Sequence, residues 1–303
     1  MSARLSLVLA VALTCLASAA PPAAQKTFAS PEEAVRALTD AVKAGKLDAV
    51  IAIFGPHGQD LAQSSDASTG QRNRQVFVAA VAEQWHLVDA GANRKTLVVG
   101  NEDWPFPVPI VKVGARWQFD TAAGKEEVLA RRIGSNELAA IATCRKYVSA
   151  QQHYARDAHD GKPAGLYAAT FQSEQGRQNG LYWPPKLGQP RSPLGDLVAE
   201  AAADGASFDP RNPPSPFHGY YFRILTAQGP HATGGARSYL VDGRLSGGFA
   251  LVAWPSHYDA TGVMTFLVNQ DGVVRQKDLG PDTAARATAM TRYDPDASWH
   301  VVH

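Results

Sequence analysis

Apolar residues at helical spacing mark the first folded segment of the chain. Val35, Leu38 and Val42 recur three and four positions apart, which is the period of one helix face. Ser30, followed by a proline and then by Glu33, has the spacing of a helix start closed by a capping box. The pattern therefore predicts a helix that begins just after Ser30.

The rest of the first half of the chain divides into short helical and strand-like runs. The expected elements are helices over 47–54 and about 71–85, a polar loop over 57–69, a strand over 96–99, and a hairpin of 107–113 and 116–119 closed at Gly114-Ala115. The expected apolar side of the third helix consists of Val76, Val78, Val81 and Trp85. Helices followed by a small antiparallel sheet make residues 28–124 an N-terminal α+β domain.

The longest helical stretch covers residues 125–156, in the middle of the chain. Residues four, three, four and three positions apart form one continuous face of it: Ala140, Cys144, Tyr147, Gln151 and Tyr154. Small residues near one end of this face allow a sheet to approach closely. We expect the face to pack on the strands around Phe222, Val252 and Phe266, and Cys144 to be shielded from solvent.

Strand-like runs separated by turn residues follow the long helix. Asp242-Gly243 and Asp271-Gly272 are typical hairpin turns. The expected elements are a short helix over 194–203 and strands over 220–226, 238–241, 249–254, 263–269 and 273–277. A long helix followed by an antiparallel meander makes residues 125–303 a second α+β domain, so the fold class is α+β throughout.

The N-terminus has the pattern of an export signal. Arg4 precedes the apolar run 5–16, and the small residues Ala17-Ser18-Ala19 follow it. We expect residues 1–19 to be a signal peptide cleaved after Ala19, residues 20–27 to be a linker, and the protein to be periplasmic or secreted. The alternative is a lipid anchor at Cys15. The residues before that cysteine favour it less than cleavage after Ala19.

The composition is typical of a folded protein, and its near-neutral charge balance gives no electrostatic reason to expect a charged partner. The 303 residues include 29 Lys+Arg and 28 Asp+Glu, and 45% are hydrophobic. Removal of residues 1–19 removes Arg4 and leaves 28 charges of each sign, so nothing points to nucleic acid as a partner. No later stretch is long and apolar enough for a transmembrane segment. Cys144 is then the single cysteine, which excludes an internal disulfide and thiolate zinc sites.

The chain is similar over nearly its whole length to the exported bacterial family known as domain of unknown function 2950. The segments that carry the resemblance are Phe28–Ala34, Asp103–Pro107, Trp117–Gly124, Arg132–Ile141, Gly180–Pro184, Ile224–Pro230, Gly247–Pro255, Phe266–Val274 and Asp278–Thr283. This resemblance implies export and a two-part architecture. It implies no reaction, because the family is defined by sequence alone.

The C-terminal half also resembles the globular domain of type IV pilins and pseudopilins. The resemblance lies in the helix from Asn136 to Tyr154 and in the strand regions 219–223, 253–262 and 266–272. It implies a pilin-like domain in which a long helix packs on a β-meander. Pilins carry a processed, membrane-embedded N-terminal half-helix, whereas here another domain precedes the helix.

Local motifs of catalysis are absent from the sequence after residue 19. It contains no G-x-S-x-G, H-E-x-x-H, Walker or G-x-G-x-x-G pattern, and none of the nine histidines is paired at i, i+4. An acidic loop at 157–161 would place Arg156 and Ala158 at calcium-ligand positions, where neither can ligate. We therefore expect no catalytic residue, no metal and no cofactor.

The strongest binding candidates are one polar cluster and two tryptophans. His257, Tyr258 and Asp259 follow Trp254-Pro255 at a strand end, where loop residues on a rigid sheet often bind ligands. Trp-Pro steps occur at 104, 183 and 254, and the indole faces of Trp183 and Trp254 suit flat sugar rings. Packing roles for these residues remain the competing interpretation.

Two functions remain open from the sequence. The first is a non-catalytic binding or assembly component of the cell envelope, whose partner is an unknown envelope protein or a glycan. The alternative is a periplasmic hydrolase or glycan-binding protein with a site near the 254–259 loop. An enzyme would need a deep cleft that holds an acid or nucleophile within hydrogen-bond reach of a base.

Overall fold

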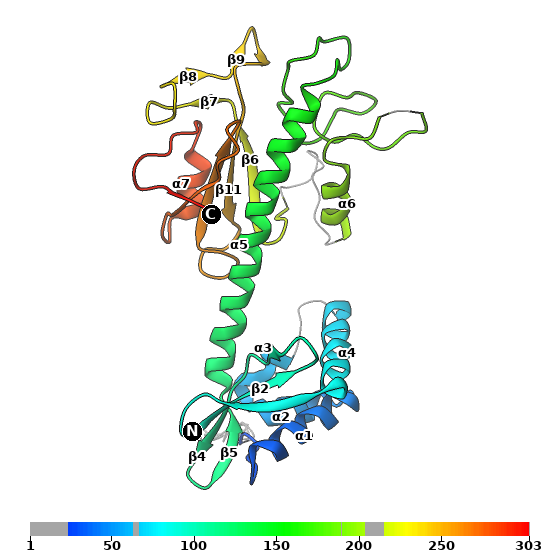
Figure 1. Ribbon diagram of the computed structural model, residues 1–303, viewed down its shortest axis with the longest axis vertical. Coiled ribbons are helices and arrows are strands. Elements are labelled where there is room, and N and C mark those ends of the chain that lie inside the picture. Colours follow the sequence, from blue (N-terminus) through cyan, green and yellow to red (C-terminus); the bar gives the residue numbers. More distant parts are fainter. Residues whose placement is uncertain (1–23, 63–66, 189, 204–214, 303) are drawn as a thin grey trace, which may run out of the picture. The chain divides into compact units, whose positions relative to one another are not determined.

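The structure is a computed structural model that describes residues 24–62, 67–188, 190–203 and 215–302. The expected signal peptide and the first part of the expected linker lie outside these residues. The chain forms two compact units, one up to Glu127 and one from Val128 (Figure 1). The sequence predicts a boundary three residues earlier, after residue 124. In the described residues, no helix is both long and apolar enough to cross a membrane.

The first unit opens with the helix that the capping signal predicts. Helix α1 (Pro31–Lys43) has Ser30 as its N-cap, and the Ser30 Oγ accepts a hydrogen bond from the Glu33 amide at 3.2 Å. The Glu33 carboxylate accepts from the amide of Ala29 at 2.8 Å, one residue before the cap. Val35 and Leu38 are buried beneath it, and α2 (Leu47–Phe54) follows as predicted.

The polar loop expected over 57–69 is largely helical, so this prediction was wrong. The segment contains a 3₁₀ turn (Pro56–Gly58), α3 (Gln59–Ala62) and the start of α4 (Ala67–Glu83). The first turns of α4 are polar, so they lack the apolar period that signals a helix, although Ala, Gln and Arg are good helix formers. The helix turns Phe77 and Val81 inward, whereas Val76 is 62% exposed.

An antiparallel sheet completes the first unit. Its strands are β1 (Trp85–Asp89), β2 (Arg94–Val99), β3 (Trp104–Pro105), β4 (Ile110–Val113) and β5 (Arg116–Phe119). They are ordered β1-β2-β4-β5, with β3 paired to β2, and the predicted β4–β5 hairpin is confirmed. Trp85 begins β1 instead of ending the preceding helix. The core lies where Leu97, Ile110 and Phe119 meet the helices.

Helix α5 (Thr121–Tyr154) begins in the first unit and forms the main helix of the second. All five residues of the predicted face are buried, since Ala140, Cys144, Tyr147, Gln151 and Tyr154 are each at most 5% exposed. The Tyr147 hydroxyl donates to the Ala250 carbonyl at 3.2 Å. The helix therefore packs on the sheet by the face that the sequence predicts.

The second unit is built on a five-stranded antiparallel sheet in the order β14-β13-β12-β11-β6. Its strands are β6 (Tyr220–Leu225), β11 (Ala250–Pro255), β12 (Met264–Asn269), β13 (Arg275–Asp278) and β14 (His300–Val301). The sequence does not predict β14 or the helix α7 (Thr283–Ala289), because both are short and weakly apolar. The predicted helix near 194–203 is α6 (Gly195–Ala203).

The segment between β6 and β11 leaves the sheet and returns to it. It contains β7 (Ala227–Gln228), β8 (Arg237–Ser238), β9 (Leu240–Val241) and β10 (Arg244–Leu245). The strand expected over 238–241 is broken at Tyr239, whose side chain is fully buried and donates to Gln228. The Tyr239 carbonyl accepts from two later amides, at 246 and 247, instead of continuing one ladder. The Asp242-Gly243 turn closes β9 and β10 as predicted.

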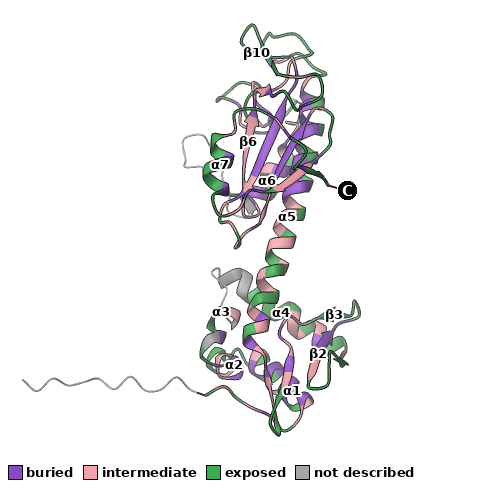
Figure 2. Cartoon of the chain, turned by 90° about the vertical axis from the view of Figure 1, so that its left-hand side faces the viewer, coloured by how far each residue is buried: buried purple, intermediate pink, exposed green. Residues whose placement is uncertain are grey.

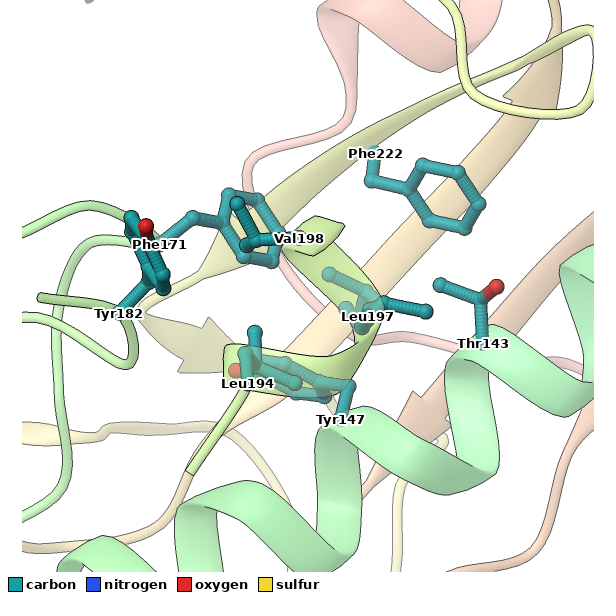
Figure 3. A pocket seen from close by; sticks show the side chains of 9 residues that line it. Thr143, Tyr147, Phe171, Tyr182, Leu194, Leu197, Val198 and Phe222 are labelled. Atoms are coloured by element: carbon teal, nitrogen blue, oxygen red, sulfur yellow. The ribbon is translucent and has the colours of Figure 1, made fainter. Parts of the chain in front are cut away.

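Helices cover both faces of the sheet in the second unit. Alternate residues of a strand point to opposite faces, so Phe222 and Arg223 on β6 define the two sides. Phe222 lines a cavity with residues of α5 and α6 (Figure 3). Arg223 donates to the Ala287 and Thr288 carbonyls at the end of α7. Figure 1 shows the sheet between α5 and α7, and the inner strands are consequently almost fully buried.

Candidate functional site

The loop after β11 is held by its own hydrogen bonds. The Thr261 amide donates to the His257 carbonyl at 2.9 Å, and the Thr261 hydroxyl accepts from the His257 amide at 3.1 Å. Asp259 adopts φ of 60° and donates its amide to the Gly262 carbonyl at 3.0 Å. The three polar residues singled out in the sequence therefore sit on a closed, well-defined turn.

Helix α5 fixes this loop to the rest of the unit. The Asn136 side-chain amide donates to the Thr261 carbonyl at 2.9 Å. The Glu137 carboxylate accepts from the amides of Val263 and Met264, both at 2.9 Å. Backbone amides at the start of a strand would otherwise lack partners, and a carboxylate is a strong acceptor for them. One turn of α5 thus positions the loop and the start of β12 together.

Two glycines permit the close approach of these segments. A Cβ at Gly262 would lie 2.1 Å from the Tyr220 hydroxyl oxygen. A Cβ at Gly219 would lie 2.7 Å from the Asn136 side-chain nitrogen, and its φ of 72° is itself in the left-handed region. Both positions therefore require glycine for steric reasons. Tyr220 donates to the Met264 carbonyl, and burial raises the pKa of its hydroxyl, as does the Glu137 carboxylate.

The side chains of the loop have few partners suited to catalysis. The His257 ring is exposed, and its Nδ1 lies 3.2 Å from the Ser256 hydroxyl. The Tyr258 hydroxyl donates to the Asp278 carboxylate at 3.2 Å, and partial desolvation together with this bond raises the pKa of the tyrosine. Asp259 is exposed. A Ser-His contact is present, but the Ser256 hydroxyl also lies 3.2 Å from that of Thr261.

Trp254 lies on β11 at the base of this loop and is half-buried. Its ring centroid is 5.8 Å from that of Tyr221, and the Arg223 guanidinium lies 5.7 Å from the ring. The guanidinium is itself fixed to the carbonyls that end α7. The indole therefore takes part in the packing between the sheet and α7, and only part of it is available to a ligand.

Trp183 lies elsewhere in the unit. It is 4% exposed, and its indole N–H donates to the Pro190 carbonyl at 3.1 Å. It packs on His159, which in turn stacks on Tyr154 with ring centroids 4.0 Å apart. Tyr154 is 18 residues beyond Asn136 on α5, which corresponds to about 27 Å of helix. The structure therefore does not bring Trp183 to the 257–259 loop.

Two cavities lined by described residues of the second unit are both small. One is apolar and lies between α5, α6, β6 and β11 (Figure 3). Its volume is about 10 Å³, the lower limit for one water. The other lies beyond the end of α5, is lined by His159, Lys162 and Arg244 among others, and measures about 80 Å³. Small-molecule sites are typically several hundred Å³ in volume. Neither cavity fits a sugar ring in the present conformation.

The buried titratable groups of α5 serve packing. Cys144 is fully buried, and burial raises the pKa of its thiol to about 12, so the thiol is protonated at neutral pH. The Gln151 side chain donates to the Ala168 carbonyl at 2.8 Å and accepts from the Ala168 amide at 2.9 Å. The sequence prediction that Cys144 is shielded is confirmed. In the described residues, no group of three or more His, Cys, Asp or Glu side chains could hold a metal ion.

Asn136 and Glu137 are the residues that the sequence interpretation overlooked as positioning groups. They precede Ala140 by four and three positions, so they extend the buried face of α5 by one turn. Polar residues that continue an apolar helix face indicate bonds to another element. That signal was available in the sequence, but the identity of the partner loop was not.

In a comparison with known proteins, one family match extends over both units. Residues 25–302 match the model of a family described as "Protein of unknown function (DUF2950)". No curated protein and no solved structure matches the chain.

Proposed function

The chain belongs to the DUF2950 family, and from this premise we propose that it is an exported cell-envelope protein that binds or assembles with another molecule without catalysing a reaction. The C-terminal unit would act as a pilin-like module, and the signal peptide over 1–19 would direct export.

The state of the 256–262 loop is the observation that carries this proposal. The amides of His257, Asp259 and Thr261 and the Thr261 hydroxyl are bonded within the turn. Asn136 and Glu137 hold the turn and the start of β12 from α5. A catalytic site needs an acid or nucleophile beside a base in a cleft that receives substrate. Neither of the two cavities described above, both lined by described residues, combines such a pair with room for a substrate.

The arrangement of α5 and the sheet supports the pilin-like part of the proposal. A long helix carries one buried face onto an antiparallel sheet, as the resemblance implies. The helix α7 on the other face and the segment 226–249 are additions that the resemblance does not account for.

A pull-down from envelope fractions tests the binding role. Tagged protein lacking residues 1–19 is crosslinked in the envelope and recovered, and His257→Ala serves as a matched variant of the loop. Recovery of pilus or secretion components at constant stoichiometry supports the assembly role. Recovery of no protein or glycan, at an expression level where the bait is folded, contradicts it.

Export is tested separately by N-terminal sequencing of the protein from the periplasm or medium. We expect the mature chain to begin at or near Ala20 and to carry no lipid. An acylated N-terminus at Cys15 would replace the signal-peptide proposal with a lipid anchor.

The hydrolase or glycan-binding alternative has one observation in its favour. Ser256 and the exposed His257 are in contact beside Trp254. If this pair acts on a substrate, Ser256→Ala abolishes turnover of glycan or ester substrates while the fold is retained. Equal activity, or none, in wild type and Ser256→Ala returns the loop to a structural role.

A further inference from the structure

The strand β6 forms one edge of the sheet in the second unit. Its four central residues are all partly exposed, whereas nearly every position of β11 and β12 is buried. Figure 2 shows the same difference, with the inner strands coloured as buried. The other edge is β14, which has only two residues. Very short edge strands resist further pairing, so β6 is the edge with length to accept another strand.

The direction of the backbone groups on β6 follows from the hydrogen bonds at its start. The Ser256 amide donates to the Gly219 carbonyl, so the backbone of Gly219 faces β11. Tyr220 exchanges both of its backbone bonds with Phe217, so its groups face away from β11. Backbone groups alternate in direction along an antiparallel strand. The N–H and C=O groups of Phe222 and Ile224 therefore also point outward.

These outward groups have no partner among the residues that the structure describes. Phe222 and Ile224 pair with Ala253 and Leu251 only as the positions of the ladder that exchange no hydrogen bonds. The N–H and C=O groups of Phe222 and those of Ile224, two residues further along, thus lie on one half-exposed edge. This spacing matches the alternate residues of an added strand.

The side chains of β6 define what such a strand would carry. Phe222 points toward Leu197 and Thr143 on the α5 and α6 side of the sheet (Figure 3). Ile224 shares that face by parity, and Arg223 lies on the α7 face. Arg223 is the only charged residue of the strand. An added strand therefore meets apolar side chains on one face and a single cation on the other. The Arg223 guanidinium donates to the carbonyls of Ala287, Thr288 and Met290, which hold it in place but do not neutralise its charge.

We propose that the β6 edge binds an extended segment of a partner protein by strand addition, and that the segment carries an acidic residue opposite Arg223 between two apolar residues. The inference rests on the proposed binding role and names its surface. A second copy of the chain fits less well in the register centred on Arg223, because two-fold pairing there would place Arg223 directly opposite Arg223. Like charges at directly opposed positions destabilise a sheet.

A labelled peptide is the direct test of this edge. The probe is a fluorescein-labelled nonapeptide of alternating threonine and valine with a central glutamate, titrated with the chain lacking residues 1–19. We expect saturable binding by anisotropy, and a loss of affinity of about tenfold when the glutamate is replaced by lysine. Equal binding of both peptides overturns the assigned charge complementarity.

Ile224→Pro removes one outward N–H and leaves the bonds to β11 intact, a position where an edge strand tolerates proline. It should abolish peptide binding, whereas Ile224→Val should retain it. If Ile224→Pro does not fold, amide exchange of the wild type decides. The Phe222 and Ile224 amides should exchange faster than those of Tyr221 and Arg223, and slow at least about tenfold on peptide saturation. Unchanged exchange overturns the proposal.

Two further outcomes separate this inference from the proposed function. A concentration-dependent dimer in sedimentation that Ile224→Pro removes assigns the edge to a second copy and overturns the proposal. An envelope partner recovered equally by wild type and Ile224→Pro leaves the binding role standing and overturns only the β6 assignment.

Discussion

The two units are both α+β, but their sheets are covered differently. In the first unit β1 alternates, with Trp85 and Leu87 half-buried and His86 and Val88 exposed. In the second unit β11 and β12 are buried at nearly every position. A sheet with one solvated face has alternating strands, whereas a sheet covered on both faces has continuous apolar strands. The continuous runs of β11 and β12 thus imply a second covering element, which α7 provides.

The same difference between the two sheets motivates the binding surface that we propose. The inner strands of the covered sheet are buried, so the backbone groups that lack a partner among the described residues lie at the β6 edge. The loop that the sequence favoured is closed by its own bonds and by α5. We therefore propose the β6 edge as the surface for a partner, with the 257–259 loop as the competing candidate.

The largest expected effect comes from truncating an inner strand of the covered sheet. Phe266 on β12 is fully buried, so Phe266→Ala should lower the free energy of unfolding by about 3–5 kcal/mol. Phe77→Ala in the first unit removes a half-buried ring and should cost about 1 kcal/mol. Urea unfolding followed by circular dichroism measures both. Equal losses of unfolding free energy would mean that the sheets of the two units are covered to the same extent.

A matched pair of glutamates tests the role of α5. Glu137 accepts two amides at the start of β12, and Glu137→Ala should cost about 2–3 kcal/mol because both amides lose a charged acceptor. Glu33→Ala removes one exposed capping bond of α1 and should cost about 0.5–1 kcal/mol. Glu137→Gln keeps an acceptor oxygen and should lie between these values. If Glu137→Ala leaves the free energy of unfolding in urea unchanged, the Glu137 carboxylate does not stabilise the start of β12.

Cys144 tests how closely α5 approaches the sheet. Cys144→Ser should cost about 1–3 kcal/mol, because the added hydroxyl is buried without a partner. Cys144→Ala is the control and should cost less than that. Native-state thiol labelling provides a second measurement: modification without unfolding would refute the packing of this helix face.

The same thiol gives a pH-dependent difference between wild type and Cys144→Ala. The folded thiol stays protonated to about pH 12, whereas the thiol of the unfolded chain ionises near the ordinary cysteine pKa of 9.0. Above pH 9.0 the unfolded state binds fewer protons, so wild-type stability should fall relative to Cys144→Ala by about 1.4 kcal/mol per pH unit up to about pH 12. Parallel stability profiles in thermal unfolding would contradict the burial of the thiol.

The smallest effect on stability is expected at side chains that are exposed in both units. His257 in the second unit and His86 in the first are both exposed, so alanine at either position should change stability by less than about 0.5 kcal/mol. A larger loss in His257→Ala, measured by urea unfolding, would show that its ring stabilises the loop. It would also favour the 257–259 loop over the β6 edge as the candidate binding surface.

Much of the helical framework was predictable because its signals are local. The cap at Ser30 and the face from Ala140 to Tyr154 lie within a few turns of one helix, and both are confirmed. The short helices over 56–62 and the start of α4 at Ala67 were missed because they lack an apolar period. The break at Tyr239 was missed because its bonding partners lie outside the predicted strand. The candidate tryptophans show the same limit: the sequence does not indicate that Trp183 is buried beside His159, away from the 257–259 loop.

The sequence by itself determined the α+β class, the main helix and its buried face, because hydrophobic period and caps act between residues a few positions apart. Only the tertiary structure decided which segments meet. Asn136 and Glu137 bind a loop about 125 residues away, α7 covers the second face of the sheet, and no described strand pairs with the outer side of β6. These pairings depend on how strands are ordered in the sheet, and strand order leaves no local pattern in the chain.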